Sequence, residues 1–111
     1  MANAYKRLGA EVVTANTDTA LYKVPVSTEA IVSELTICNI GSTARTFRVA
    51  HVDAGDIGDV VNEDYKAYDC TLDANSSIMI CAGLSMGAAD TILVRANHAE
   101  VVFNLSGVEI T

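Results

Sequence analysis

Residues 29–52 read EAIVSELTICNIGSTARTFRVAHV, and the pattern of this segment indicates the fold class. Apolar and polar side chains alternate on both sides of the turn-forming residues NIGS at 39–42. Successive side chains of a strand point to opposite faces, so this alternation predicts two strands, Glu29–Asn39 and Thr46–Val52.

The same alternation recurs along the whole chain, with turn residues between the segments. Many short strands at this spacing, with one proline and no tryptophan in 111 residues, favour an antiparallel sandwich. We therefore expect one all-β domain over residues 1–111, a jelly-roll-like β-sandwich in which only Gly87–Asp90 could hold a helical turn. The eight predicted strands are Tyr5–Val13, Ala20–Val24, Glu29–Asn39, Thr46–Val52, Tyr65–Leu72, Ser77–Ala82, Thr91–Arg95 and Glu100–Ile110.

One row of apolar side chains in each main strand is expected to form the core. Phe47 and Val49, for example, share one face of their strand, with Thr46 and Arg48 on the other. The predicted core residues are Ile31, Leu35, Ile37, Phe47, Val49, Ile78, Ile80, Ile92, Val94, Val101, Phe103 and Leu105.

The opposite faces of these strands carry few charged side chains. A chain that stays single in solution usually solvates such a face with lysine and glutamate. Two interpretations stay open: another strand or the amino-terminal segment covers the face, or the face is an interface between subunits. The residues expected on it are Val32, Thr36, Cys38, Met79, Cys81 and Val102.

The charge balance argues against several kinds of partner. Seven basic residues stand against 14 acidic ones, a net charge of −7, so nucleic acid and anionic lipid are disfavoured. No apolar run approaches the roughly 20 residues that span a bilayer. The opening MANAYKRLGAEVV has no apolar core of a secretory signal, which predicts synthesis in the cytoplasm.

The three cysteines, Cys38, Cys70 and Cys81, match no zinc or redox spacing. They are candidates for disulfides between subunits, and the alternative is three reduced thiols that act as small hydrophobes. The two histidines, His51 and His98, form no local metal or nucleophile pattern. The sequence therefore predicts no cofactor, no metal site and no catalytic residue.

The segment Asp53–Asp64, DAGDIGDVVNED, holds five carboxylates and no base. Carboxylates in a flexible loop are typical calcium ligands, but the spacing of an EF-hand loop is absent. We expect a solvated acidic loop, with calcium binding as the alternative.

Five segments resemble a family of small virion structural proteins of tailed bacteriophages. They are MANAYKRLG at the start, YKVP at 22–25, ICNIGSTARTFRVA at 37–50, KAYDCTLDANSS at 66–77 and VVFNLSGVEIT at 101–111. The resemblance implies a β-sandwich subunit at the capsid, neck or tail of the particle, with no catalytic residue to carry over. The acidic segment Asp53–Asp64 departs from the family pattern.

The expected function is therefore structural rather than enzymatic. The resemblance favours a capsid decoration (cement) subunit in the virion, in contact with copies of itself and with major capsid or neck proteins. The alternatives are a neck, collar or tail accessory subunit, or a receptor- or carbohydrate-binding module on a fibre. The last would need exposed aromatic platforms, for which the tyrosines are Tyr5, Tyr22, Tyr65 and Tyr68.

Overall fold

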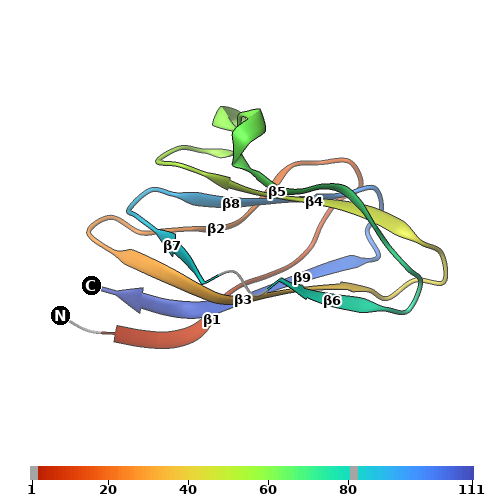
Figure 1. Ribbon diagram of the computed structural model, residues 1–111, viewed down its shortest axis with the longest axis horizontal. Helices are drawn as coiled ribbons and strands as arrows, with labels where there is room; N and C mark the ends of the chain where they lie inside the picture. The colour runs from red at the N-terminus through yellow and green to blue at the C-terminus, as the bar shows by residue number, and fades with distance from the viewer. Residues whose placement is uncertain (1–2, 81–82) are drawn as a thin grey trace.

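Two antiparallel sheets lie face to face in the computed structural model, which describes residues 3–80 and 83–111 (Figure 1). The strands of the described residues are β1 (Asn3–Val12), β2 (Thr19–Lys23), β3 (Glu29–Asn39), β4 (Arg45–Val52), β5 (Tyr65–Leu72), β6 (Ser77–Ile80), β7 (Leu84–Met86), β8 (Thr91–Ala96) and β9 (Val101–Ile110). Sheet A has the order β1–β9–β3–β6, with β7 also paired to β3, and sheet B has the order β2–β8–β4–β5.

This strand order is that of a jelly roll, in which strands distant in sequence, such as β1 and β9, are neighbours. The predicted antiparallel β-sandwich is therefore confirmed. All eight predicted strands are present, and most bounds agree within one or two residues. The sixth was predicted to reach residue 82, but residues 81–82 lie outside the described part of the chain. The short strand β7 was not predicted.

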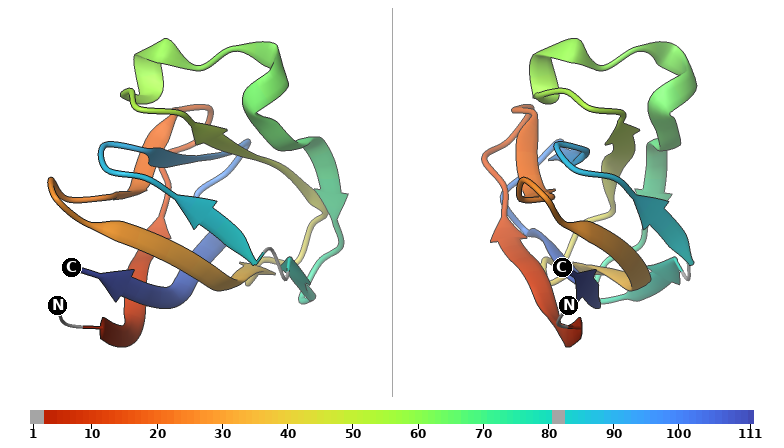
Figure 2. Two further views of the ribbon diagram at one scale, coloured as in Figure 1. Left: turned by 60° about the vertical axis from the view of Figure 1, so that its left-hand side comes forward. Right: turned by 90° about the vertical axis from the view of Figure 1, so that its left-hand side faces the viewer.

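The core lies between the two sheets, whose arrangement is seen from two further directions in Figure 2. Phe47 of sheet B and Phe103 of sheet A are its largest side chains, and both are fully buried. Nine of the twelve predicted core residues are buried: Leu35, Ile37, Phe47, Val49, Ile92, Val94, Val101, Phe103 and Leu105.

The prediction was wrong for Ile31, which is 43% exposed on the outer face of sheet A. Its neighbour Val32, expected on the outer face, is instead 1% exposed in the core. The cause is a β-bulge: β3 pairs in register with β9 at Val32 and again at Glu34, and the extra residue Ser33 reverses the alternation.

The prediction also overstated the burial of β6. Ile78 is 39% exposed and Ile80 is partly buried, although both point to the inner side with their partners Ile37 and Leu35. Strand β6 is four residues long and lies at the edge of sheet A, so its side chains have neighbours on one flank only.

The turn between β3 and β4 is organised by the fully buried Asn39. Its amide nitrogen donates to the carbonyls of Thr43 and Leu72, and its side-chain oxygen accepts the Gly41 N–H at 2.9 Å. The turn predicted from NIGS therefore closes through one asparagine whose side-chain polar atoms are all paired.

Candidate functional site

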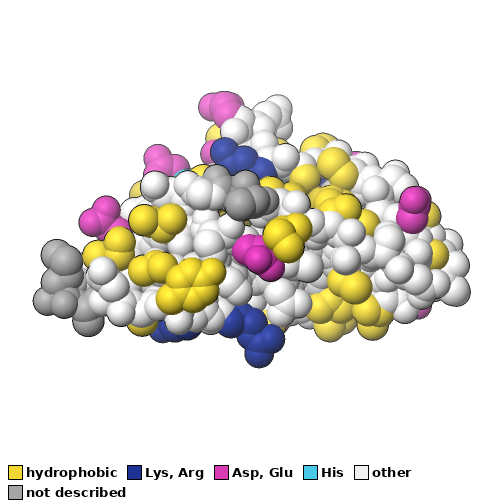
Figure 3. Space-filling view, turned by 60° about the horizontal axis from the view of Figure 1, so that its bottom comes forward, with side chains coloured by type: hydrophobic (Ala, Val, Ile, Leu, Met, Phe, Trp, Pro, Cys, Tyr) yellow, Lys and Arg dark blue, Asp and Glu magenta, His cyan; other side chains and the backbone are white. Residues whose placement is uncertain are grey.

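The outer face of sheet A carries exposed apolar side chains on three different strands. Tyr5 and Val12 of β1 are 69% and 57% exposed, and Met79 of β6 is 61% exposed. Ile31 of β3 is exposed on the same side. We call the outer surface of sheet A the sheet A face, and apolar side chains gather on this side of the molecule (Figure 3). The Tyr5 hydroxyl is hydrogen-bonded to the Ser33 hydroxyl at 2.8 Å, which holds the ring against the sheet.

Three charged residues lie among these apolar side chains on the sheet A face. Arg7 and Glu34 pair in register with Ser106 of the central strand β9, and Glu29 lies at the start of β3. Arg7 Nη1 donates to Asn104 Oδ1 at 3.3 Å. The face therefore carries both signs of charge within a largely apolar surface. Of the residues predicted to point outward, Thr36, Cys38, Met79 and Val102 do so, Val32 does not, and Cys81 lies outside the described residues.

The two candidate thiols in the described part of the chain, Cys38 and Cys70, are not brought together. Cys38 is half-buried on the sheet A face, whereas Cys70 is exposed on β5 at the edge of sheet B. Stacked sheets lie about 10 Å apart and a disulfide needs Cα atoms within roughly 7 Å, so these two do not pair within one chain. Cys81 lies outside the described residues. Pairing between subunits stays a prediction.

The acidic segment Asp53–Asp64 lies over the outer face of sheet B, and most of its residues are exposed, as expected of a solvated loop. It contains two 3₁₀ turns, η1 (Ile57–Asp59) and η2 (Asn62–Asp64), where no helical turn was predicted. A small second core lies beneath the segment. Ile57, Val60 and Tyr65 pack there against Ala50, Val52 and Leu93.

Three of the five carboxylates of this segment, Asp56, Asp59 and Asp64, have separate partners. Asp59 Oδ2 accepts the Asp56 N–H at 2.9 Å, and Asp64 Oδ2 accepts the Val61 N–H at 3.0 Å, so each closes its own turn. Asp56 is paired with Lys23 of β2. Within residues 3–80 and 83–111, no group of three or more histidine, cysteine, aspartate or glutamate side chains is arranged to hold a metal ion.

A buried carboxylate, Asp90, anchors the start of the acidic segment to the turn before β8. It is 4% exposed and accepts the Ala54 N–H at 2.7 Å, the Gly87 N–H at 2.9 Å and a bond with His51 Nε2 at 2.9 Å. Burial alone would raise the pKa of Asp90, but the bonds from His51, Ala54 and Gly87 outweigh it and lower the pKa. His51 thus pairs with a carboxylate and with neither described thiol.

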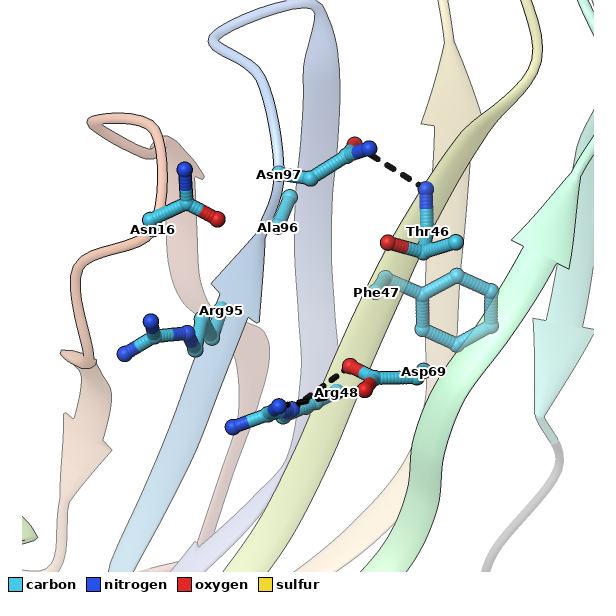
Figure 4. A pocket seen from close by; sticks show the side chains of 8 residues that line it. All are labelled: Asn16, Thr46, Phe47, Arg48, Asp69, Arg95, Ala96 and Asn97. Carbon is cyan, nitrogen blue, oxygen red and sulfur yellow. Dashed lines mark hydrogen bonds and ion pairs between the residues drawn. The ribbon is translucent and has the colours of Figure 1, made fainter.

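The part of sheet B left uncovered by the acidic segment forms a polar hollow of about 210 Å³ (Figure 4). Sequence reasoning missed it, because its residues come from four separate segments. The only signal was the outward position of Thr46 and Arg48. We call it the sheet B hollow, and its lining residues are Asn16, Thr46, Phe47, Arg48, Asp69, Arg95, Ala96 and Asn97.

A β-bulge in β5 shapes one side of the sheet B hollow. Phe47 pairs with Cys70 and Val49 with Ala67, so both Tyr68 and Asp69 stand opposite Arg48. Asp69 has a left-handed φ of 50°. Its carboxylate accepts Arg48 Nε at 2.6 Å and Nη2 at 3.1 Å, and the guanidinium lies 4.1 Å from the Tyr68 ring centroid. The bulge thus places an anion and an aromatic ring on the same arginine.

The charges in the sheet B hollow are balanced. The hydrogen bond from Arg48 is the main reason that the pKa of Asp69 is lowered, and it also raises the pKa of Arg48. Arg95, the register partner of Arg48 on β8, donates from Nη1 to Asp18 Oδ1 at 3.2 Å. Two arginines therefore face two aspartates, with no net charge among the four groups.

The four tyrosines are distributed over both sheets. Tyr5 lies on the sheet A face. The Tyr22 hydroxyl donates to Glu109 Oε2 at 2.5 Å. The pKa of Tyr22 is raised, mainly because burial removes the hydroxyl from water, and the bond to Glu109 raises it further. Tyr65 and Tyr68 contact each other edge to face, with ring centroids 4.9 Å apart, and line a second hollow with Asn62. Aromatic surface is therefore present beside the sheet B hollow.

No protein-family model matches this chain, and neither does any curated protein. In the described part of the chain there is no helix long and apolar enough to cross a membrane.

Proposed function

We propose that this chain is a non-enzymatic structural protein of a bacteriophage particle, a capsid decoration (cement) subunit that contacts copies of itself and neighbouring capsid proteins. The observation that carries the proposal is the sheet A face, where Tyr5, Val12, Ile31 and Met79 are 43–69% exposed on paired strands. The resemblance of five segments to small virion proteins agrees with this role.

The sheet A face presents side chains that are common in interfaces. Tyrosine and methionine, here Tyr5 and Met79, are enriched in protein interfaces. Its side chains stand on a sheet whose backbone is already hydrogen-bonded, so association would order few further groups. Burial of such side chains would therefore contribute free energy at little entropic cost.

A second copy of the chain is the partner that the charges on this face suit. An interface about a two-fold axis must be self-complementary, because the same patch occurs on both subunits. The sheet A face offers Arg7 on β1 and Glu29 and Glu34 on β3, so one copy's arginine can meet the other's glutamate.

The two sides of the molecule differ in charge, which also suits one-sided assembly. The five carboxylates of Asp53–Asp64 lie over sheet B, away from the sheet A face. Repulsion between like-charged segments disfavours stacking through sheet B. In a particle with many copies, a modest area per contact adds up to considerable stability.

Self-association can be tested by sedimentation velocity over a concentration series. We expect the wild-type chain to form dimers or larger species, and Ile31→Lys and Met79→Lys to shift it to monomers. Val61→Lys is the matched control, because Val61 is 52% exposed on the acidic segment over sheet B. A chain that stays monomeric at high concentration, or a control that dissociates equally, contradicts the proposed use of sheet A.

The place in the particle can be tested by quantitative mass spectrometry of purified virions. Hundreds of copies per particle are expected for a decoration subunit. About a dozen copies would instead support the alternative, a neck, collar or tail accessory subunit that uses the same face. Absence of the chain from the particle would refute both.

A further inference from the structure

We propose that the sheet B hollow binds a saccharide ring that bears one carboxylate, such as a uronic acid. The hollow lies on the opposite sheet from the association face, so this inference goes beyond the structural role, and either proposal can fail without the other.

Two of the six non-glycine residues with positive φ in the described part of the chain line the hollow. Asn16 has φ 55° in the loop between β1 and β2, and Asp69 has φ 50° in the bulge of β5. Asparagine and aspartate tolerate this region better than other side chains. Non-glycine residues held there cluster at ligand sites, and bulges re-aim side chains beside such sites. Both residues line the hollow.

Arg95 offers an open edge to a carboxylate. Among the hydrogen bonds of the described residues, Arg95 uses only Nη1, toward Asp18. Its Nε and Nη2 atoms form the planar fork that matches the two oxygens of a carboxylate. The Nε and Nη2 atoms of Arg48 already donate to Asp69. Arg95 is therefore the arginine that would bind the carboxylate of the ligand.

The remaining polar groups suit the hydroxyls of a sugar ring. Asp69 accepts two bonds from Arg48 and keeps further lone pairs for a hydroxyl donor. Asn97 uses its oxygen for the Thr46 N–H at 3.0 Å, which leaves its amide N–H groups as donors. The side chains of Asn16, Asn97, Arg48 and Arg95 surround this space in the close view (Figure 4).

The charge balance selects a singly charged ligand over a polyanion. Arg48 and Arg95 are already matched by Asp69 and Asp18, and the chain carries a net charge of −7. A phosphate-rich chain would meet a repulsive field with no excess of positive charge in the hollow. One carboxylate on a hydroxyl-rich ring uses the fork of Arg95 and otherwise relies on neutral hydrogen bonds.

The size of the hollow suits one ring with room for extension. Its volume of about 210 Å³ is below the roughly 300–1,000 Å³ of drug-sized pockets. Arg48 of the hollow contacts the ring of Tyr68, and Tyr68 lines a second hollow with Tyr65 and Asn62. A second sugar residue of the same glycan would find an aromatic surface there.

Binding can be tested by chemical-shift titration of the isotope-labelled protein with D-galacturonate, D-galactose and acetate as probes. We expect galacturonate to shift the amide signals of residues 46–48, 68–69 and 95–97. Galactose, which lacks the carboxylate, and acetate, which lacks the ring, are each expected to bind about tenfold more weakly.

Two variants and a matched control separate the site from general charge effects. Arg95→Gln removes the fork, and Asn16→Gly removes one amide while keeping the left-handed backbone; each is expected to weaken galacturonate binding about tenfold. Arg7→Gln makes the same charge change on the sheet A face and should leave binding unchanged, as should Ile31→Lys. Thermal unfolding verifies that each variant folds.

Four outcomes would overturn the proposal. The first is that galacturonate causes no signal shifts. The second and third are that acetate binds as tightly as galacturonate, which would mean a site for anions only, or that galactose does, which would mean that the carboxylate has no role. The fourth is that Arg95→Gln binds galacturonate as tightly as the wild-type chain. The sedimentation result for the sheet A variants is independent of all four.

Discussion

Arg48 lies directly opposite Arg95 across strands β4 and β8, and each guanidinium has a carboxylate of its own. Like charges opposite each other destabilise an antiparallel pair. Asp69 and Asp18, from two other segments, remove this repulsion. Asp69 lies in the bulge of β5, and Asp18 lies in the loop before β2. These four charges therefore come together only when the chain has folded.

Removal of the Asp69 carboxylate should lower the melting temperature, and more so at low salt, because Arg48 then faces Arg95 without its partner. Asp69→Gly and Asp69→Ala both remove the carboxylate, but glycine adopts φ 50° without strain. We therefore expect the glycine variant to melt at the higher temperature. Thermal unfolding by circular dichroism at low and high salt measures both effects; the reverse order would contradict the strained bulge.

Phe103→Ala should destabilise the chain by about 3–5 kcal/mol, because the ring is fully buried and its loss leaves a cavity. Val102→Ala, on the same strand but facing outward, is the control and should cost less than about 1 kcal/mol. Urea unfolding provides both free energies. Equal costs at the two positions would mean that the faces of β9 are wrongly assigned.

Asp90 should make stability depend on pH in the acid range. Its lowered pKa means that the folded state favours the carboxylate, so this stability is complete above the ordinary value of 3.8 and is lost as the pH falls through the lowered pKa. Asp90→Asn should remove this part of the pH dependence and cost about 1–3 kcal/mol at neutral pH. Chemical unfolding between acid and neutral pH tests this; the exposed Asp53→Asn is the control.

Millimolar calcium should leave the melting temperature unchanged. Asp56, Asp59 and Asp64 already have separate partners, and no metal-binding group is assembled in residues 3–80 and 83–111. Neutralising Asp53 and Glu63 together should likewise change stability little. A calcium-induced rise of several degrees that Asp56→Asn abolishes would show that the segment binds the ion.

Cys70 should react with iodoacetamide faster than Cys38 in the native chain, since Cys70 is exposed and Cys38 is half-buried. Peptide mass spectrometry after short labelling times resolves each thiol. If disulfides between subunits form in oxidised particles, we expect them through Cys70 or Cys81, so the multimers on non-reducing gels should disappear in Cys70→Ser or in Cys81→Ser and persist in Cys38→Ser. Faster labelling of Cys38 would contradict the packing of the sheet A face.

Local pattern was sufficient for the strands themselves. The bounds Glu29–Asn39 and Tyr65–Leu72 agree with β3 and β5, because alternation and turn residues act over a few neighbours along the chain. The inward row of Leu35, Phe47 and Phe103 followed from the same period. The all-β sandwich was thus determined by the sequence alone.

Tertiary structure decided where that pattern is interrupted and what the surfaces carry. Ile31 and Val32 exchange faces because of the pairing of β3 with β9, and Ile78 is exposed because β6 is an edge strand. The sheet B hollow joins Asn16, Asp69 and Arg95 from distant parts of the chain. Bulges, edges and sites depend on which strands become neighbours, and that choice is made by packing over the whole chain rather than by local alternation.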